Sequence, residues 1–452
     1  MRSVNPATGE TIREYKEQRE DEVDRIIADA GRAFRSWSAL SIGERSKALG
    51  RVASALEESA EEYAYLITTE MGKRFEESRG EIRKCAWLAR YVSQQGEAAL
   101  IPEPIPTEAS ESYVRFDPLG VILAVMPWNF PFWQLFRAGI PAIMAGNVVL
   151  LKHAPNVTGC ALAIEELMAE AGLPEGVLQA LLVSEERVDE IIRREEIRGV
   201  TLTGSDEAGR AVAERAGGEI KKSVLELGGS DPFIVFRDAD IEAAVEAAVT
   251  SRMINAGQSC IAAKRFLIEQ GVYQEFLDRF ARRFTSLRVG HPLDLETQVA
   301  PLAREDLLDN LHRQVAESRA AGAELCCGGE QYDSQGYYYR PTVLTNVTPQ
   351  MPVFTEETFG PVAPIMPFRD MEEAVELANM SDYGLGASVW SGDRGQAKEI
   401  AARLEAGCVF INDVVTSDPR LPFGGVKRSG YGRELSRYGI REFTNIKSVW
   451  IS

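Results

Sequence analysis

The 452-residue sequence has little histidine, scattered cysteine and no long hydrophobic run, and each shortage argues against a class of protein. Its three histidines, His153, His291 and His312, give poor support to a histidine-rich metal site or a serine–histidine–aspartate triad. Its six cysteines contain no C-x-x-C pair, which argues against a disulfide framework and a zinc site. We therefore expect no metal, although residue counts alone leave a cysteine–histidine hydrolase possible.

Positive charge is also scarce, because 50 Lys and Arg stand against 68 Asp and Glu, for a net charge of −18. Nucleic acids and anionic membranes need clustered Lys and Arg, so neither is expected as a partner. The start, Met1–Pro6, does not resemble a signal sequence, and no apolar run is long enough to span a membrane, so we expect a cytoplasmic protein. Adaptation to high salt also produces an acidic surface, so composition leaves the habitat open.

The length exceeds what one hydrophobic core usually supports, so two or three domains are expected. The first hundred residues are predicted to be helical. The apolar stripe within Val23–Trp37 has helical spacing, and Gly43–Met71 and Phe75–Ala99 continue the pattern. Three prolines in Ile101–Pro106 then predict an extended boundary.

From residue 120 onward, short apolar runs alternate with amphipathic stretches, which predicts an α/β protein with doubly wound parallel sheets. The predicted strands of the first sheet are Val121–Met126, Val148–Leu151, Val177–Val183 and Val200–Leu202, and the crossover helices are Gln134–Ala145, Thr158–Ala171 and Glu186–Arg194. The predicted strands of the second sheet are Phe233–Phe236, Arg265–Glu269, Thr342–Leu344, Ala387–Trp390 and Cys408–Asn412, with helices Ile241–Met253, Tyr273–Leu287 and Met371–Met380. Two further β-rich stretches, Ser112–Phe116 and Asn445–Ile451, lie outside both sheets and could pair into a ribbon that joins another subunit.

The segment Asn255–Cys260 sets a cysteine behind a glycine-containing turn, where backbone amides can point toward whatever the sulfur attacks. Glu226 precedes the glycine pair Gly228–Gly229, and a thiol nucleophile with a separate carboxylate base can make and then hydrolyse a thioester. Asn129 offers an uncharged N–H donor that suits an oxyanion. Each residue alone has a simpler interpretation, because most cysteines are inert small hydrophobes and most turn asparagines satisfy their own turn.

The segment Thr203–Gly209 follows an apolar strand and opens a helix, where free amides can cradle a phosphate. Lys152 ends the predicted strand Val148–Leu151, at the edge where wound sheets bind cofactors. Gly204 and Ser205 would then bind a dinucleotide pyrophosphate and Lys152 would lie near a ribose. A lone Gly-Ser sequence is more often only a helix cap.

Six segments, in this order and spacing, resemble the NAD(P)-dependent aldehyde dehydrogenase superfamily over nearly the whole chain. They are Pro127–Pro131, Thr203–Ser205, Glu226–Gly229, Asn255–Cys260, Glu356–Pro361 and Pro422–Lys427. More narrowly, Lys152–Val157 and Leu225–Pro232 resemble the short bacterial-type succinate-semialdehyde dehydrogenases. The resemblance implies two Rossmann-like domains and a small β oligomerisation ribbon. The expected boundaries are 1–100 and 118–226 for the dinucleotide-binding domain, 227–428 for the catalytic thiol domain, and 101–117 and 429–452 for the oligomerisation segment of a homodimer or homotetramer.

The resemblance also implies the catalytic roles. Cys260 would add to an aldehyde, Asn129 and the Cys260 amide would hold the oxyanion, and Glu226 would activate the water that hydrolyses the thioester. A thiol hydrolase without redox chemistry would leave the cofactor residues without a purpose. A related semialdehyde or a general aliphatic aldehyde remains an alternative substrate to succinate semialdehyde.

For the cofactor, the resemblance implies that Glu357 binds the nicotinamide ribose and that Phe359 and Trp128 lie near it. NAD-selective members often have an acidic residue where this chain has Pro155, so we expect both NAD and NADP to be used. No acidic residue follows Lys152 until Glu165, although a carboxylate from elsewhere in the fold is not visible in the sequence. The neighbouring His153 is expected to face solvent.

For the substrate, the resemblance implies that Arg137, eight residues after Asn129, binds a distal carboxylate, with Ser417 as a helper. A second arginine found in some relatives is Ile254 here, so this part of the match is incomplete. The alternative for Arg137 is a structural ion pair.

Overall fold

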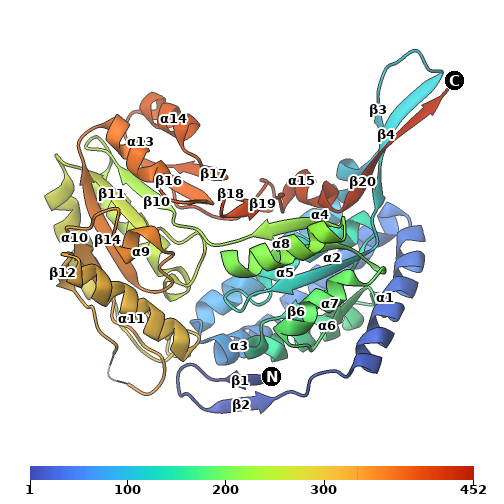
Figure 1. Ribbon diagram of the computed structural model, residues 1–452, viewed down its shortest axis with the longest axis horizontal. Coiled ribbons are helices and arrows are strands. Elements are labelled where there is room, and N and C mark those ends of the chain that lie inside the picture. Colours follow the sequence, from blue (N-terminus) through green and yellow to red (C-terminus); the bar gives the residue numbers. More distant parts are fainter. Residues whose placement is uncertain (333) are drawn as a thin grey trace.

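The computed structural model describes residues 1–332 and 334–452. It is built on two mainly parallel sheets, which lie in two separate halves of the molecule (Figure 1). The first sheet has the strand order β19-β9-β8-β5-β6-β7, in which only β19 is antiparallel. Its strands are β5 (Val121–Met126), β6 (Val148–His153), β7 (Leu178–Ala180), β8 (Ile197–Thr203), β9 (Lys222–Glu226) and β19 (Gly430–Tyr431). A parallel sheet covered on both faces was expected from the continuous apolar runs, and this fold class is confirmed.

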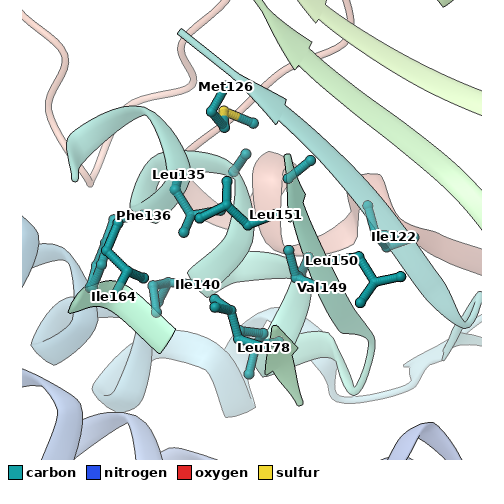
Figure 2. Close-up of a cluster of buried hydrophobic side chains, with 14 of the residues drawn as sticks. Ile122, Met126, Leu135, Phe136, Ile140, Val149, Leu150, Leu151, Ile164 and Leu178 are labelled. Atoms are coloured by element: carbon teal, nitrogen blue, oxygen red, sulfur yellow. The ribbon is translucent and has the colours of Figure 1, made fainter. Parts of the chain in front are cut away.

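Helices from both ends of the chain cover the first sheet. They are α1 (Glu20–Ala39), α2 (Ile42–Glu58), α3 (Ala60–Met71), α4 (Phe75–Leu100), α5 (Trp133–Ala145), α6 (Thr158–Glu170), α7 (Val188–Arg193), α8 (Asp206–Gly218) and α15 (Ser436–Glu442), with the short 3-10 turns η1 (Pro155–Val157) and η2 (Glu185–Arg187). The core between α5, α6 and the strands is apolar throughout (Figure 2). Its labelled side chains are Ile122, Met126, Leu135, Phe136, Ile140, Val149, Leu150, Leu151, Ile164 and Leu178. This packing fixes where the carboxyl ends of β5 and β6 lie.

The second sheet has the strand order β12-β13-β14-β11-β10-β16-β17, in which only β12 is antiparallel. Its strands are β10 (Pro232–Val235), β11 (Arg265–Glu269), β12 (Glu324–Cys327), β13 (Thr342–Thr345), β14 (Val362–Phe368), β16 (Gly386–Trp390) and β17 (Cys408–Ile411). The covering elements are α9 (Ile241–Met253), η3 (Ile254–Gly257), α10 (Tyr273–Thr285), α11 (Glu305–Ala320), α12 (Pro352–Thr355), α13 (Met371–Asn379) and α14 (Arg394–Arg403). The pair β15 (Tyr383–Gly384) and β18 (Val426–Lys427) forms a small separate sheet.

A three-stranded antiparallel ribbon projects away from both sheets at the upper right of Figure 1, with the C-terminus at its tip. It consists of β3 (Glu103–Pro104), β4 (Glu111–Pro118) and β20 (Thr444–Ile451), and β20 pairs with β4 along its whole length. The pairing expected between Ser112–Phe116 and Asn445–Ile451 is thus confirmed. Ile446, Trp450 and Ile451 are exposed on this ribbon.

Two features differ from the sequence predictions. The first hundred residues are not all helical, because β1 (Arg2–Val4) and β2 (Thr11–Glu14) form a hairpin. These strands are too short, and β2 is too exposed, to produce an apolar period. Residues 429–443 also do not extend the ribbon, since β19 pairs with β9 and α15 packs on α4 and α5. The ribbon begins only at Thr444, and the other domain boundaries remain predictions.

Among residues 1–332 and 334–452, no helix is both long and apolar enough to cross a membrane. In the same part of the chain, no group of three or more His, Cys, Asp or Glu side chains could hold a metal ion.

Candidate active site

The cysteine of the Asn255–Cys260 segment follows three consecutive residues with left-handed backbone. Their φ angles are 53° at Asn255, 54° at Ala256 and 81° at Gly257. Residues other than glycine rarely adopt this backbone conformation. It costs of order 1–3 kcal/mol per non-glycine residue, so the surrounding structure must hold it. Glycine is required at 257, since a Cβ there would collide with the Gly360 carbonyl. The turn leaves the Cys260 thiol half-buried between the two sheets.

Arg252 is the residue that holds this turn. Its buried guanidinium donates hydrogen bonds to the carbonyl oxygens of Gly257 (3.0 Å), Ala263 (2.9 Å), Thr358 (3.0 Å) and Gly360. Burial lowers the pKa of Arg252 to about 9. Because one side chain bonds both the turn and the 358–360 segment, the sites of the cysteine and of Glu357 are linked rigidly.

Asn129 lies against the same turn, just after β5. Its Nδ2 donates to the Gln258 carbonyl at 3.1 Å, and Asn255 Nδ2 donates to the Asn129 carbonyl at 2.9 Å. These bonds join Asn129 to Asn255 and Gln258, so it is anchored two residues from Cys260 along the chain. An amide donor in a buried site next to a thiol can stabilise a developing oxyanion.

Lys264, four residues after Cys260, connects the cysteine to Glu357. Its buried ammonium donates to the carbonyls of Ser259 (2.9 Å) and Cys260 (2.7 Å) and lies 3.4 Å from Glu357 Oε1. Glu357 also accepts a hydrogen bond from the Gly229 amide at 2.9 Å. Burial raises the pKa of Glu357 and Lys264 opposes that shift.

Glu226 ends β9 and its carboxylate is buried. Among the residues that the structure describes, neither carboxylate oxygen has a hydrogen-bond partner. Burial raises the pKa of Glu226 to about 8, and Arg137, whose Nη2 lies 3.8 Å from Glu226 Oε2, opposes this shift. A carboxylate with a pKa near neutrality and free oxygens is suited to accept a proton from water.

Arg137 lies between two buried carboxylates. Its Nε donates to Glu434 Oε2, and its guanidinium packs 4.4 Å from the centre of the Phe423 ring. The ion pair that was the alternative interpretation of Arg137 is therefore present. Its Nη2 has no hydrogen-bond partner among the described residues, so the two N–H groups of this nitrogen remain for a ligand.

The Cys260 thiol is influenced by the same cations. Burial raises the pKa of Cys260 to about 12, and Arg137 and then Lys264 oppose the shift. The sulfur therefore carries its proton at neutral pH in this state. The thiol must therefore lose this proton before the sulfur can attack an aldehyde carbon.

The predicted cofactor residues gather at the carboxyl edge of the first sheet. Trp128 follows β5, Lys152 lies near the end of β6, Pro155 begins η1, and Gly204 and Ser205 follow β8. The Ser205 hydroxyl caps α8 by accepting from the Ala208 amide at 3.2 Å. The Gly204 amide donates to the Glu226 carbonyl at 3.0 Å, so a phosphate would be bound by the helix terminus that follows.

Phe359 reaches this edge from the second sheet. Its ring meets the Trp128 ring edge-on at a centroid distance of 5.8 Å. Two residues expected near the nicotinamide, Trp128 after β5 and Phe359 before β14, are thus in contact.

Two neighbours of Lys152 differ from what the sequence indicated. Glu185 from η2 lies 3.8 Å from Lys152 Nζ, which supplies a carboxylate from elsewhere in the fold. His153 does not face solvent: its buried Nε2 donates to the Pro131 carbonyl at 2.8 Å, while Nδ1 accepts from the Ala154 amide. Burial lowers the pKa of His153 to about 4, so the ring is neutral and holds the turn after β5.

Ser417 lies in the loop after β17 and contacts α4 and the start of α5. Its hydroxyl oxygen accepts hydrogen bonds from Lys84 Nζ (2.8 Å) and Trp133 Nε1 (3.1 Å). Because the oxygen accepts both bonds, its own proton is available for a ligand. Lys84, Trp133, Arg252, Lys264 and Glu434 were not identified from the sequence. Trp133, Arg252 and Lys264 lie within four residues of a motif, next to Asn129, Asn255 and Cys260 respectively, so the sequence could have drawn attention to them.

The fold and the thiol site define a member of a known class, since the chain matches the aldehyde dehydrogenase family over residues 1–449. The protein belongs to that family. It is 49% identical over the whole chain to the NADP(+) succinate-semialdehyde dehydrogenase 1 of Mycobacterium tuberculosis, covering 99% of that protein. It is 48% identical to the NAD(P)+ succinate semialdehyde dehydrogenase Sad of Escherichia coli, with 99% of this chain and 97% of that one covered.

Solved structures agree with this assignment. The succinic semialdehyde dehydrogenase of Streptococcus pyogenes, determined in complex with NADP+, superposes with a TM-score of 0.98 at 37% identity. The match covers 100% of this chain and 99% of that one. The two-sheet architecture is therefore that of the family.

Proposed function

We propose that this protein oxidises succinate semialdehyde to succinate, with NAD(P)+ as the oxidant. The observation that carries the proposal is the buried cluster in which Arg137 lies beside both Glu226 and Cys260 and has an Nη2 without a hydrogen-bond partner among the described residues. The names of the relatives at 48–49% identity support the choice of substrate. A related semialdehyde is the nearest alternative.

In the proposed reaction, the site residues act one after another. The Cys260 sulfur adds to the aldehyde carbon, and the carbonyl oxygen becomes an oxyanion that accepts a hydrogen bond from Asn129 Nδ2. Bound NAD(P)+ supplies the acceptor for the hydride that leaves this carbon, which produces a thioester on Cys260. Glu226 then takes a proton from water, the oxygen attacks the thioester carbon, and the C–S bond breaks to release succinate and the thiol.

The remaining predicted roles follow from position. The residues at the sheet edge fit a dinucleotide, because Lys152 offers a buried cation and α8 offers a capped N-terminus beside it. Glu357, Trp128 and Phe359 would hold the nicotinamide end. Arg137 Nη2 and the Ser417 proton would donate to the distal carboxylate of the substrate.

The exposed ribbon supports assembly into a homodimer or homotetramer. Its outer strand β20 has one unpaired edge and exposes large apolar side chains, and such an edge is a template for pairing with another chain. We keep the cytoplasmic location as a prediction.

The substrate assignment is tested by steady-state rates of the wild-type protein on straight-chain aldehydes with and without a terminal carboxylate. We expect kcat/KM for succinate semialdehyde to exceed that for butyraldehyde by about ten- to a hundredfold, the effect of charge-assisted hydrogen bonds. Equal values would contradict the carboxylate preference. Substitution of Arg137 is a poor probe, since it also leaves Glu434 buried without its partner.

The role of Glu226 predicts a pH profile. Its pKa of about 8 means that the ionised, basic form increases as the pH rises toward that value. The rate of thioester hydrolysis should therefore rise up to a pH of about 8 and level off above it. Glu226→Gln should still release one equivalent of reduced cofactor per site in a stopped-flow burst, followed by steady turnover about 10²–10⁴-fold slower.

The matched control is Glu246→Gln, since Glu246 pairs with Arg283 at 3.2 Å on an exposed face. This variant should keep the wild-type rate and profile. Undiminished steady turnover in Glu226→Gln would refute the general-base role.

The surroundings of Lys152 predict the use of both cofactors, with discrimination below roughly a hundredfold, or ~3 kcal/mol. Pro155→Glu should disfavour NADP+ by repelling its 2′-phosphate, whereas Glu185→Gln should favour NADP+ by removing a carboxylate beside Lys152. The measurement is kcat/KM for each cofactor at a fixed aldehyde concentration. A wild-type protein with no NADP+ turnover at saturation would show this interpretation of Pro155 to be wrong.

The ribbon is tested by deleting residues from Thr444 onward. The deletion removes the whole β20–β4 pairing, so we expect monomeric or unstable protein by light scattering and thermal unfolding. Trp450→Ser keeps the strand and removes one exposed apolar side chain, so it should weaken association without unfolding the subunit. A fully active monomer after the deletion would rule out a bridging role.

A further inference from the structure

Lys84, on the inner side of α4, lies where three separate elements meet. Its half-buried side chain brings Nζ within 2.8 Å of Ser417 Oγ, in the loop after β17. The same Nζ lies 4.4 Å from the centre of the Trp133 ring at the start of α5. Trp133 in turn donates to Ser417, so an ammonium, a hydroxyl and an indole form one cluster.

The charge of Lys84 is not neutralised by the acidic residues around it. Asp418 is paired with Arg420 at 2.6 Å. Glu81 is paired with the buried Lys73, and its other oxygen accepts two backbone amides at the start of α5. The hydrogen-bond partner of the Lys84 ammonium is therefore the neutral Ser417 hydroxyl. A cation taken partly out of water without a carboxylate is costly and favours an anionic ligand.

A second cation lies close by on the side of the reacting atoms. Arg137, one turn after Trp133 on α5, interacts with both Lys84 and Cys260. Its Nε is used by Glu434, whereas the Lys84 ammonium has two further N–H bonds to give. Arg137 keeps its Nη2 for the same carboxylate, but its charge is paired with Glu434, whereas that of Lys84 is paired with no carboxylate among the described residues.

We propose that Lys84 binds the distal carboxylate of the substrate together with Ser417, and that it determines the preference for an acidic aldehyde. This inference rests on the proposed function. Trp133 supports the ammonium from its other side through a cation–π contact, which holds the amine in place without neutralising it.

The test compares Lys84→Met with Lys84→Arg. Methionine keeps the apolar stem and removes the charge, so KM for succinate semialdehyde should rise about ten- to a hundredfold while kcat changes little, because the lost contact is remote from the reacting carbon. Butyraldehyde should be oxidised with unchanged kcat/KM. Lys84→Arg should retain most of the preference for succinate semialdehyde. Arg83→Met, which removes an exposed cation on the same helix, should behave as wild type.

A second readout is the pH dependence of the ratio of kcat/KM for succinate semialdehyde to that for butyraldehyde. The groups that face Lys84 are Glu81 and Cys85 on α4, Arg137 on α5 and Asp418 in the loop. Burial, and then Arg137, lowers the pKa of Lys84 to about 8, so the ammonium loses its proton as the pH passes that value. The ratio should therefore fall above a pH of about 8 in the wild type and be flat in Lys84→Met. Any titration of Glu226 affects both substrates and cancels.

The outcomes separate the two proposals. Equal wild-type rates on the two aldehydes would overturn the proposed function itself. A wild type that discriminates, with a Lys84→Met variant that discriminates equally well, would overturn only the role of Lys84. Equal losses on both aldehydes in Lys84→Met would also overturn it, since they indicate a purely structural lysine. Succinate and butyrate, the products of the two aldehydes, can also be tested as inhibitors. Weaker inhibition by succinate in Lys84→Met, with unchanged inhibition by butyrate, would support the role of Lys84 even if turnover were low.

Discussion

The bonds made by Arg252 are the constraint on which the active site depends. The turn before Cys260 requires two non-glycine residues in left-handed backbone, which an isolated chain would not keep. Arg252 supplies hydrogen bonds to four carbonyls in this turn and in the segment that follows Glu357. Each carbonyl left buried without a partner would cost about 1–3 kcal/mol, so one side chain stabilises the geometry of both the nucleophile and the cofactor carboxylate.

Buried charge determines the chemistry that the site can perform. Burial alone would keep Cys260 and Glu226 protonated, and Arg137 and Lys264 partly reverse this effect. A buried arginine is itself costly, and Glu434 balances it. The carboxylate that balances Arg137 belongs to the C-terminal part of the chain, so residues 429–443, which also bury Leu435, Ile440 and Phe443 against the first sheet's core, contribute to the site.

Much of the fold was predictable because buried parallel strands are continuous apolar runs, and β5 matches its predicted limits. Strand β14 was missed because Pro364 and Pro367 argue against a central strand, yet both pair there. In the site, motifs led to Cys260 and Glu226 as the proposed nucleophile and base. Lys84 could not be found in this way, since its partner Ser417 is 333 residues away and only tertiary packing brings them together.

Both proposed ligands are anions, whereas the chain carries a net charge of −18. The overall field therefore does not attract them, and recognition must come from cations within the cleft, where the low dielectric strengthens each contact. Lys152 lies at the cofactor edge of the first sheet, whereas Lys84 lies in the cluster with Trp133 and Ser417. The first ammonium is buried and the second half-buried, and burial depresses the pKa of each. Binding of an anion would raise both pKa values, so ligand binding and proton uptake are coupled at the two lysines.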